Sequence, residues 1–273
     1  MSATAMSMDE QRKTVPDFAL DVAAGLWFVS MLAGQAVFLY YILAFYAQPT
    51  LTGNFAAWGA NPFLEKGFID GDASGNLAFA AHVMVAALVT FFGMLQLVPQ
   101  IRARALPFHR WNGRIFLTAA MIASLSGFYM VWARGEIGDM TNALAISLNG
   151  ALIVTFAALA LKTVLARDID SHRRWAMRTL LAANGVFFLR LGVFSFIVIT
   201  QQNISAFQFH IFQFASFLLP LAVLELYFRA RANGALAKLS MAIGLVGCAA
   251  YTGAGIVGFV MIFVKMVLGA APA

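Results

Sequence analysis

Long apolar stretches recur along the whole chain, each roughly twenty residues long and nearly free of charge. An α-helix rises about 1.5 Å per residue, so each stretch is long enough to cross the roughly 30 Å hydrocarbon core of a bilayer. Hydrocarbon offers no partner to backbone N–H and C=O groups, so such segments must be helical. The sequence therefore predicts an all-α fold, a polytopic transmembrane helical bundle with about seven spans. The expected spans are residues 18–46, 76–98, 107–133, 142–165, 172–200, 205–228 and 237–268.

This pattern divides the chain into a tail of residues 1–17, one bundle of residues 18–268 and a tail of residues 269–273. The one long connection in the bundle, residues 47–75, falls on the outer side and is either a lid over a pocket or a solvated loop. Pro220 is expected to kink the sixth span, because a proline frees a backbone carbonyl one turn earlier.

Composition excludes several classes of protein. Apolar residues make up 62% of the chain and charged residues 11%, whereas about a quarter of a soluble domain is charged. The lone cysteine, Cys248, excludes an internal disulfide. The basic residues stand in short clusters between apolar runs, which favours a role in membrane orientation over nucleic-acid binding.

The distribution of Lys and Arg predicts the orientation. Most of these residues fall on one side of the bundle, which the positive-inside rule assigns to the cytoplasm. The N-terminus is therefore expected to be cytoplasmic. The inner set is Arg12, Lys13, Arg102, Arg104, Arg110, Arg114, Lys162, Arg167, Arg173, Arg174, Arg178, Arg229, Arg231 and Lys238, and the outer set is Lys66, Arg134 and Lys265.

The positions of the four histidines are the most informative feature for function. His82 and His210 each lie roughly 10 Å inside the outer ends of their spans, whereas His109 and His172 open two spans at the inner face. Haem iron takes an axial imidazole from each side, so the two pairs would hold two b-type haems stacked across the bilayer. A hydrogen bond to a neighbouring helix would also account for the outer pair. Lipid phosphate, a helix cap or a carboxylate would account for the inner pair.

Arg190 is expected to lie roughly 15 Å deep in the fifth span, where an arginine costs about 3 kcal/mol. No acidic residue is predicted at that depth. Its partner would be an anionic ligand group such as a haem propionate, or the oxygen of a quinone. The alternative is that Arg190 extends toward the outer interface or bonds backbone carbonyls of a kinked neighbour, for which Pro220 is a candidate.

A second polar group is expected near the inner face. Glu225, close to the end of the sixth span, would form an ion pair with Arg114, Arg178 or Arg229, or would take part in a proton relay. Together with Arg110, these side chains form an interfacial polar cluster.

Several segments carry a resemblance to a known family. They are His82 with Gly93-Met94-Leu95-Gln96, the run Pro107-Phe108-His109-Arg110-Trp111-Asn112-Gly113-Arg114, the run Ser171-His172-Arg173-Arg174-Trp175-Ala176-Met177-Arg178, and Arg190. They resemble the predicted membrane protein family called domain of unknown function 2306, over the second to the sixth span.

The resemblance implies a bacterial membrane protein with seven or eight helices and no established activity, and the expected location is the bacterial inner (cytoplasmic) membrane. The positions that match the pattern are His82, His109, Arg110, Arg114, His172, Met177, Arg178, Arg190 and Glu225, whereas His210 does not match it. In outline the bundle is also similar to the ascorbate-reducible cytochromes b, which hold two haems by paired histidines; this is an analogy of fold alone.

These observations favour a b-type cytochrome-like transmembrane electron carrier that holds haem b through His82, His210, His109 and His172, with Arg190 beside the outer site. Its partners would be the lipid bilayer and a quinone or a redox partner protein. The alternative is a haem-free membrane transporter or an accessory subunit of a larger membrane complex. The sequence contains no His-Glu-x-x-His or serine-elbow motif, which argues against a hydrolase and leaves open whether the chain is an enzyme.

Overall fold

A computed structural model of the chain describes residues 14–61, 66–135 and 139–269, with the side chains of residues 265–269 excepted. Most of the predicted N-terminal tail, including Arg12 and Lys13, and the end of the C-terminal tail lie outside the described residues. Within those ranges every regular element is a helix, which confirms the all-α prediction.

The helices follow the predicted spans with three differences. The first span, α2 (Val15–Ile42), continues through a π-helical turn, η1 (Leu43–Ala47), into α3 (Gln48–Thr52). The third span is preceded by a short helix, α5 (Pro99–Arg104). The fifth span is two helices, α8 (Ile169–Ala183) and α9 (Gly185–Thr200). The remaining elements are η2 (Phe55–Ala60), α4 (Ala73–Leu97), α6 (Leu106–Phe128) with η3 (Tyr129–Ala133), α7 (Met140–Leu165), α10 (Ala206–Arg231) and α11 (Ala235–Gly269).

Six of these helical segments are long and apolar enough to cross a membrane, and α8 with α9 adds a seventh crossing if the bent pair is one span. The predicted span over residues 172–200 is not one continuous helix, because α8 and α9 are bent by 56° relative to each other. Two short helices, α3 and η2, lie within the first half of the expected loop of residues 47–75.

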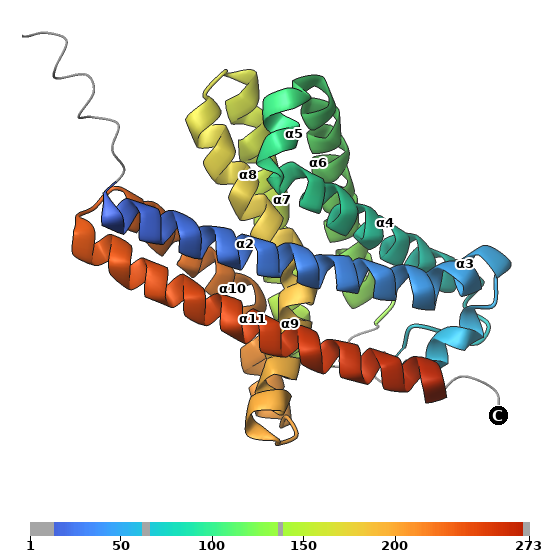
Figure 1. The fold of residues 1–273 in the computed structure, drawn as a ribbon. Coiled ribbons are helices and arrows are strands. Elements are labelled where there is room, and N and C mark those ends of the chain that lie inside the picture. Colours follow the sequence, from blue (N-terminus) through green and yellow to red (C-terminus); the bar gives the residue numbers. More distant parts are fainter. Residues whose placement is uncertain (1–13, 62–65, 136–138, 270–273) are drawn as a thin grey trace, which may run out of the picture.

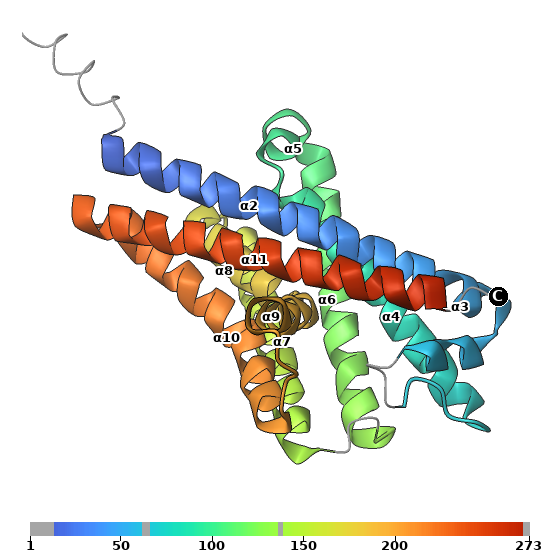
Figure 2. The ribbon, with the colours of Figure 1, turned by 60° about the horizontal axis from the view of Figure 1, so that its bottom comes forward.

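The first and last spans run parallel and side by side (Figures 1 and 2). Lys238 Nζ lies 2.6 Å from Asp17 Oδ1 and Arg231 Nη1 lies 2.7 Å from Asp21 Oδ1, which ties the two helix starts together. An odd number of crossings requires this parallel arrangement, so the packing agrees with seven. The side of the membrane on which the N-terminus lies stays a prediction.

Polar residues fix where the helices begin. Thr14, Asp72, Asp139 and Asp168 each accept a hydrogen bond from a backbone amide in the first turn of α2, α4, α7 and α8. Ser205 and Gln208 form a reciprocal capping box at the start of α10. Such caps satisfy amides that have no partner within the helix.

Candidate functional site

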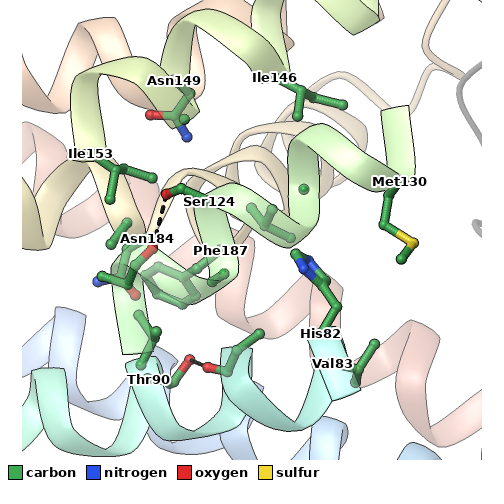
Figure 3. A pocket seen from close by; sticks show the side chains of 18 of the residues that line it. His82, Val83, Thr90, Ser124, Met130, Ile146, Asn149, Ile153, Asn184 and Phe187 are labelled. Atoms are coloured by element: carbon green, nitrogen blue, oxygen red, sulfur yellow. Dashed lines mark hydrogen bonds between the residues drawn. The ribbon is translucent and has the colours of Figure 1, made fainter. Parts of the chain in front are cut away.

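The described part of the bundle contains a pocket of about 310 Å³, at the lower end of the range typical of small-molecule sites (Figure 3). Its walls come from α2, η1, α4, α6, η3, α7 and the junction of α8 with α9. The lining includes members of two hydrophobic clusters, one around Phe38 and Phe79 and one around Val89 and Ile153. The pocket therefore lies where two cores of the bundle meet.

Three irregular stretches of helix converge on this pocket. Tyr46 comes from the π-helical turn η1, Met130 and Val131 from the π-helical turn η3, and Asn184 from the break between α8 and α9. π-helical turns are rare and are frequently found at functional sites. Irregular backbone at membrane depth is tolerated where it is buried in protein or lines a cavity.

His82 lines the pocket from α4, opposite Ile146 and Asn149 of α7 (Figure 3). Its Nδ1 lies 2.7 Å from Ser126 Oγ, and the Ser126 hydroxyl donates to the Ala123 carbonyl at 3.0 Å. The serine oxygen therefore accepts the Nδ1 proton, which leaves Nε2 as the acceptor in the neutral ring. His82 thus offers the pocket one oriented lone pair.

Arg190 lines the same pocket from α9. No carboxylate among the described residues forms an ion pair with it. Its guanidinium carbon lies 5.2 Å from the ring centre of Phe38 and 6.0 Å from that of Tyr41, and Nη1 donates to its own helix, to the Val186 carbonyl, at 3.4 Å. Most of its donors are thus available to an oxygen atom in the pocket.

Two amide side chains hold the break between α8 and α9. Asn184, at the break, donates from Nδ2 to the Leu180 carbonyl at 2.8 Å, and Asn149 of α7 donates from Nδ2 to the Ala182 carbonyl at 3.1 Å. These bonds satisfy carbonyls at the end of α8. Gly185 allows the close approach, because a Cβ there would lie 2.6 Å from Asn149 Nδ2.

The outer segment after α3 covers one wall of the pocket. Trp58 of η2 is fully buried, with its ring centre 5.1 Å from that of Phe79, and Asn61 donates to the hydroxyls of Tyr41 at 2.9 Å and Tyr46 at 2.7 Å. Phe79, Tyr41 and Tyr46 all line the pocket. Trp58 and Asn61 therefore hold this part of the segment against the bundle.

The structure does not bring His210 to the pocket that His82 lines. His210 Nε2 contacts Asp139 Oδ2, which joins the start of α10 to the start of α7. The Asp139 carboxylate also accepts the Thr141 amide proton, and these contacts hold its pKa below the ordinary value. Pairing of His82 with His210 on one haem gains no support from these contacts.

The inner histidines lie at the other end of the bundle. His172 Nδ1 donates to the Ala160 carbonyl at 2.9 Å, because a carbonyl can only accept. His109 lies within electrostatic range of His172, and its Nδ1 is buried without a hydrogen-bond partner. No cluster of three or more His, Cys, Asp or Glu side chains in the described ranges could hold a metal ion. A haem iron needs only two protein ligands, so this finding leaves the haem prediction untested.

Of the predicted interfacial residues, Glu225 contacts Arg178, with Oε1 2.7 Å from Nε, and this pair joins α10 to α8. Arg114 lies over the ring of Trp111, 4.8 Å from its centre, and Arg110 is exposed. These three arginines and Glu225 do not line the pocket.

Sequence reasoning missed several polar residues of the pocket. Thr90, Ser124, Asn149 and Asn184 are polar side chains within apolar spans, and that signal alone could have singled them out. The aromatic wall from the first span had no such signal.

A family model described as "Predicted membrane protein (DUF2306)" matches residues 79–228. The matched segment contains all four histidines, Arg190 and Glu225, whereas α2 and α11 lie outside it. No curated protein and no solved structure matches the chain.

Proposed function

Because the chain belongs to the DUF2306 family of predicted membrane proteins, whose description gives a location and no activity, we propose a function from the pocket: it binds the headgroup of a membrane quinone. The observation that carries this proposal is that His82 and Arg190, with which no described carboxylate forms an ion pair, both line one apolar pocket. Through that ligand the chain would serve membrane electron transfer, in keeping with the expected bacterial inner membrane.

The chemistry of the lining fits a quinone in both of its redox states. A guanidinium donates to a quinone carbonyl, and an imidazole Nε2 lone pair accepts from a quinol hydroxyl. Phe38, Phe79 and Phe187 supply aromatic walls for a planar ring. The volume suits one headgroup, with the isoprenoid tail leaving toward lipid.

A binding measurement tests this proposal. The purified chain in nanodiscs is titrated with a short-tailed ubiquinone analogue, with tryptophan fluorescence as the signal, because Trp58 packs against the pocket wall. Arg190→Leu is expected to weaken binding about tenfold or more, the loss typical of a hydrogen bond to a charged group, and His82→Phe is expected to weaken it less. His210→Ala is the matched control, since His210 lies outside the pocket. Absence of saturable binding, or an equal loss in the control, would reject the proposal.

Haem b at the inner histidine pair is a second proposal, supported by the orientation of His172. A ligating histidine usually donates its other ring N–H to a carbonyl or carboxylate, as His172 Nδ1 does to Ala160. His172 and His109 would then supply the two axial imidazoles.

An absorption spectrum tests the haem proposal. Protein purified from haem-replete cells should show a Soret band that is lost in His109→Ala and in His172→Ala and kept in His210→Ala. Colourless wild-type protein would reject haem and leave the quinone proposal intact.

A further inference from the structure

We infer that the end of the bundle formed by α5 and the starts of α6 and α8 binds the phosphate of an anionic phospholipid. This basic end is defined by six arginines: Arg102, Arg104, Arg110, Arg114, Arg173 and Arg174. The inference is independent of the quinone pocket, because none of these residues lines it.

Three segments converge at the basic end. α5 begins with Pro99, is six residues long and packs against both α4 and α6. His109 in the first turn of α6 lies within electrostatic range of Arg102 from α5 and of His172 from α8. Figure 1 shows α5, α6 and α8 together at one end of the molecule. The three segments therefore reach the same end of the bundle, where Arg174 lies over the ring of Phe228 of α10.

The positive charge of the basic end exceeds its negative charge within the described residues. Two aspartates, Asp168 and Asp170, lie at the start of α8 and keep their negative charge, and Asp168 caps that helix by accepting the Ser171 amide proton. None of the six arginines forms an ion pair among the described residues, although Arg114 lies over the ring of Trp111 and Arg174 over that of Phe228. An anion from outside the chain can therefore pair with them.

The apolar side chains of the basic end place that anion in the headgroup layer. Trp111 is 63% exposed, Phe108 49% and Leu106 43%, and all three belong to the first turns of a membrane-spanning helix. Arginine beside tryptophan is typical of the membrane–water interface, where the ring lies at headgroup level and the cation meets lipid phosphate. A phospholipid satisfies both requirements, because its phosphate pairs with arginine while its acyl chains cover the exposed aromatic side chains.

The test compares two variants that remove the same charge. Arg102→Gln with Arg110→Gln changes the basic end, and Lys162→Gln with Arg167→Gln changes exposed cations at the end of α7. Each protein is placed in nanodiscs of phosphatidylcholine with or without phosphatidylglycerol, and the relative affinity for the two lipids is measured with spin-labelled lipid. Wild type should prefer phosphatidylglycerol. In the first variant, the affinity for phosphatidylglycerol relative to phosphatidylcholine should fall about fivefold for each charge removed. The second variant should keep the preference.

Quenching of Trp111 provides a local readout, with the Trp111→Phe protein subtracted as background. Brominated phosphatidylglycerol should quench Trp111 more than brominated phosphatidylcholine does in the wild type, and the difference should vanish in the Arg102→Gln, Arg110→Gln protein. Equal losses in both charge variants would mean that net charge alone acts, and would overturn the inference. It would also be overturned by the absence of preference in the wild type, or by displacement of the spin-labelled lipid with inorganic phosphate, which would indicate a site for a free anion.

Discussion

The fifth and sixth spans pack against each other, but only the fifth is interrupted, and the interruption lies at the pocket. α10 contains Pro220 and is one helix over its whole length, whereas the α8–α9 span has no proline and is bent by 56° at Asn184. The junction of α8 and α9 lines the pocket, and no residue of α10 does.

In these two spans the interruption lies at Asn184, where there is no proline, and Pro220 does not interrupt α10. A break becomes tolerable where other side chains satisfy the backbone groups it frees. Asn149 and Asn184 do so at the α8–α9 junction, and Gly185 gives Asn149 the room to reach it. The break therefore depends on residues of two spans, Asn149 in α7 and Asn184 at the α8–α9 junction.

A larger side chain at Gly185 should have the largest effect, because it would disturb the α8–α9 break and leave α10 intact. The Cβ of Gly185→Val would meet Asn149 Nδ2 and displace it from the Ala182 carbonyl. Overpacking costs about 1–3 kcal/mol, so we expect a lower midpoint of thermal unfolding in detergent and loss of binding of the quinone analogue. Pro220→Ala should lower neither, because alanine is the better helix former and no residue of α10 lines the pocket. If Pro220→Ala lowered the unfolding midpoint or the binding of the quinone analogue more than Gly185→Val does, the pocket would depend on α10 more than on the α8–α9 break.

Removing the bond across the break should have the next largest effect. Asn149→Leu takes away the donor to the Ala182 carbonyl and should destabilise the fold by about 1 kcal/mol. Asn142→Leu is the matched control on the same helix, since the Asn142 side-chain oxygen is buried without a partner. We expect the control to be neutral or stabilising in equilibrium unfolding. The structural role of Asn149 would be refuted by equal effects of the two substitutions.

Much of the fold followed from the sequence because membrane burial acts on each span separately. The apolar runs predicted the long helices, and the scarcity of charge within them drew attention to His82 and Arg190, which the structure places in one pocket wall. Glu225 had three candidate partners, and the structure pairs it with Arg178.

What the sequence did not reveal depends on contacts between spans. The break at Asn184 has no proline to mark it and relies on Asn149, more than thirty residues away. His82 and His210 were expected to share a level, yet His210 contacts Asp139 at the start of α7. Depth along a helix can be estimated from residue count, but the direction that a side chain faces depends on how the helices pack.

The ion pair that joins the two spans should contribute less than either change at the break. Arg178 Nε lies 2.7 Å from Glu225 Oε1, and the Glu225 side chain is 41% exposed. A pair of this exposure is worth about 0.2–1 kcal/mol. A double-mutant cycle with Arg178→Gln and Glu225→Gln should return a coupling energy in that range. A coupling well above the range would mean that α8 and α10 move as one body.

The smallest expected effect is a pH response confined to the starts of α7 and α10, which the contact between Asp139 and His210 joins. The pKa of Asp139 is below its ordinary value, chiefly because its carboxylate accepts the Thr141 amide proton and also because it contacts His210. A lowered pKa in the folded state means that the ionised carboxylate stabilises the fold. That contribution is fully present above the unfolded pKa, about 4, and is lost as the pH falls through the folded value. Below about pH 4, therefore, the protection of backbone amides against hydrogen exchange should fall at the starts of α7 and α10 and stay unchanged in α9. Asp139→Asn should show the faster exchange already at neutral pH and lose its acid dependence, whereas Pro220→Ala should keep that dependence. If acid instead opens α9 first, the break at Asn184, and not the contact between Asp139 and His210, is the weaker point of the two spans.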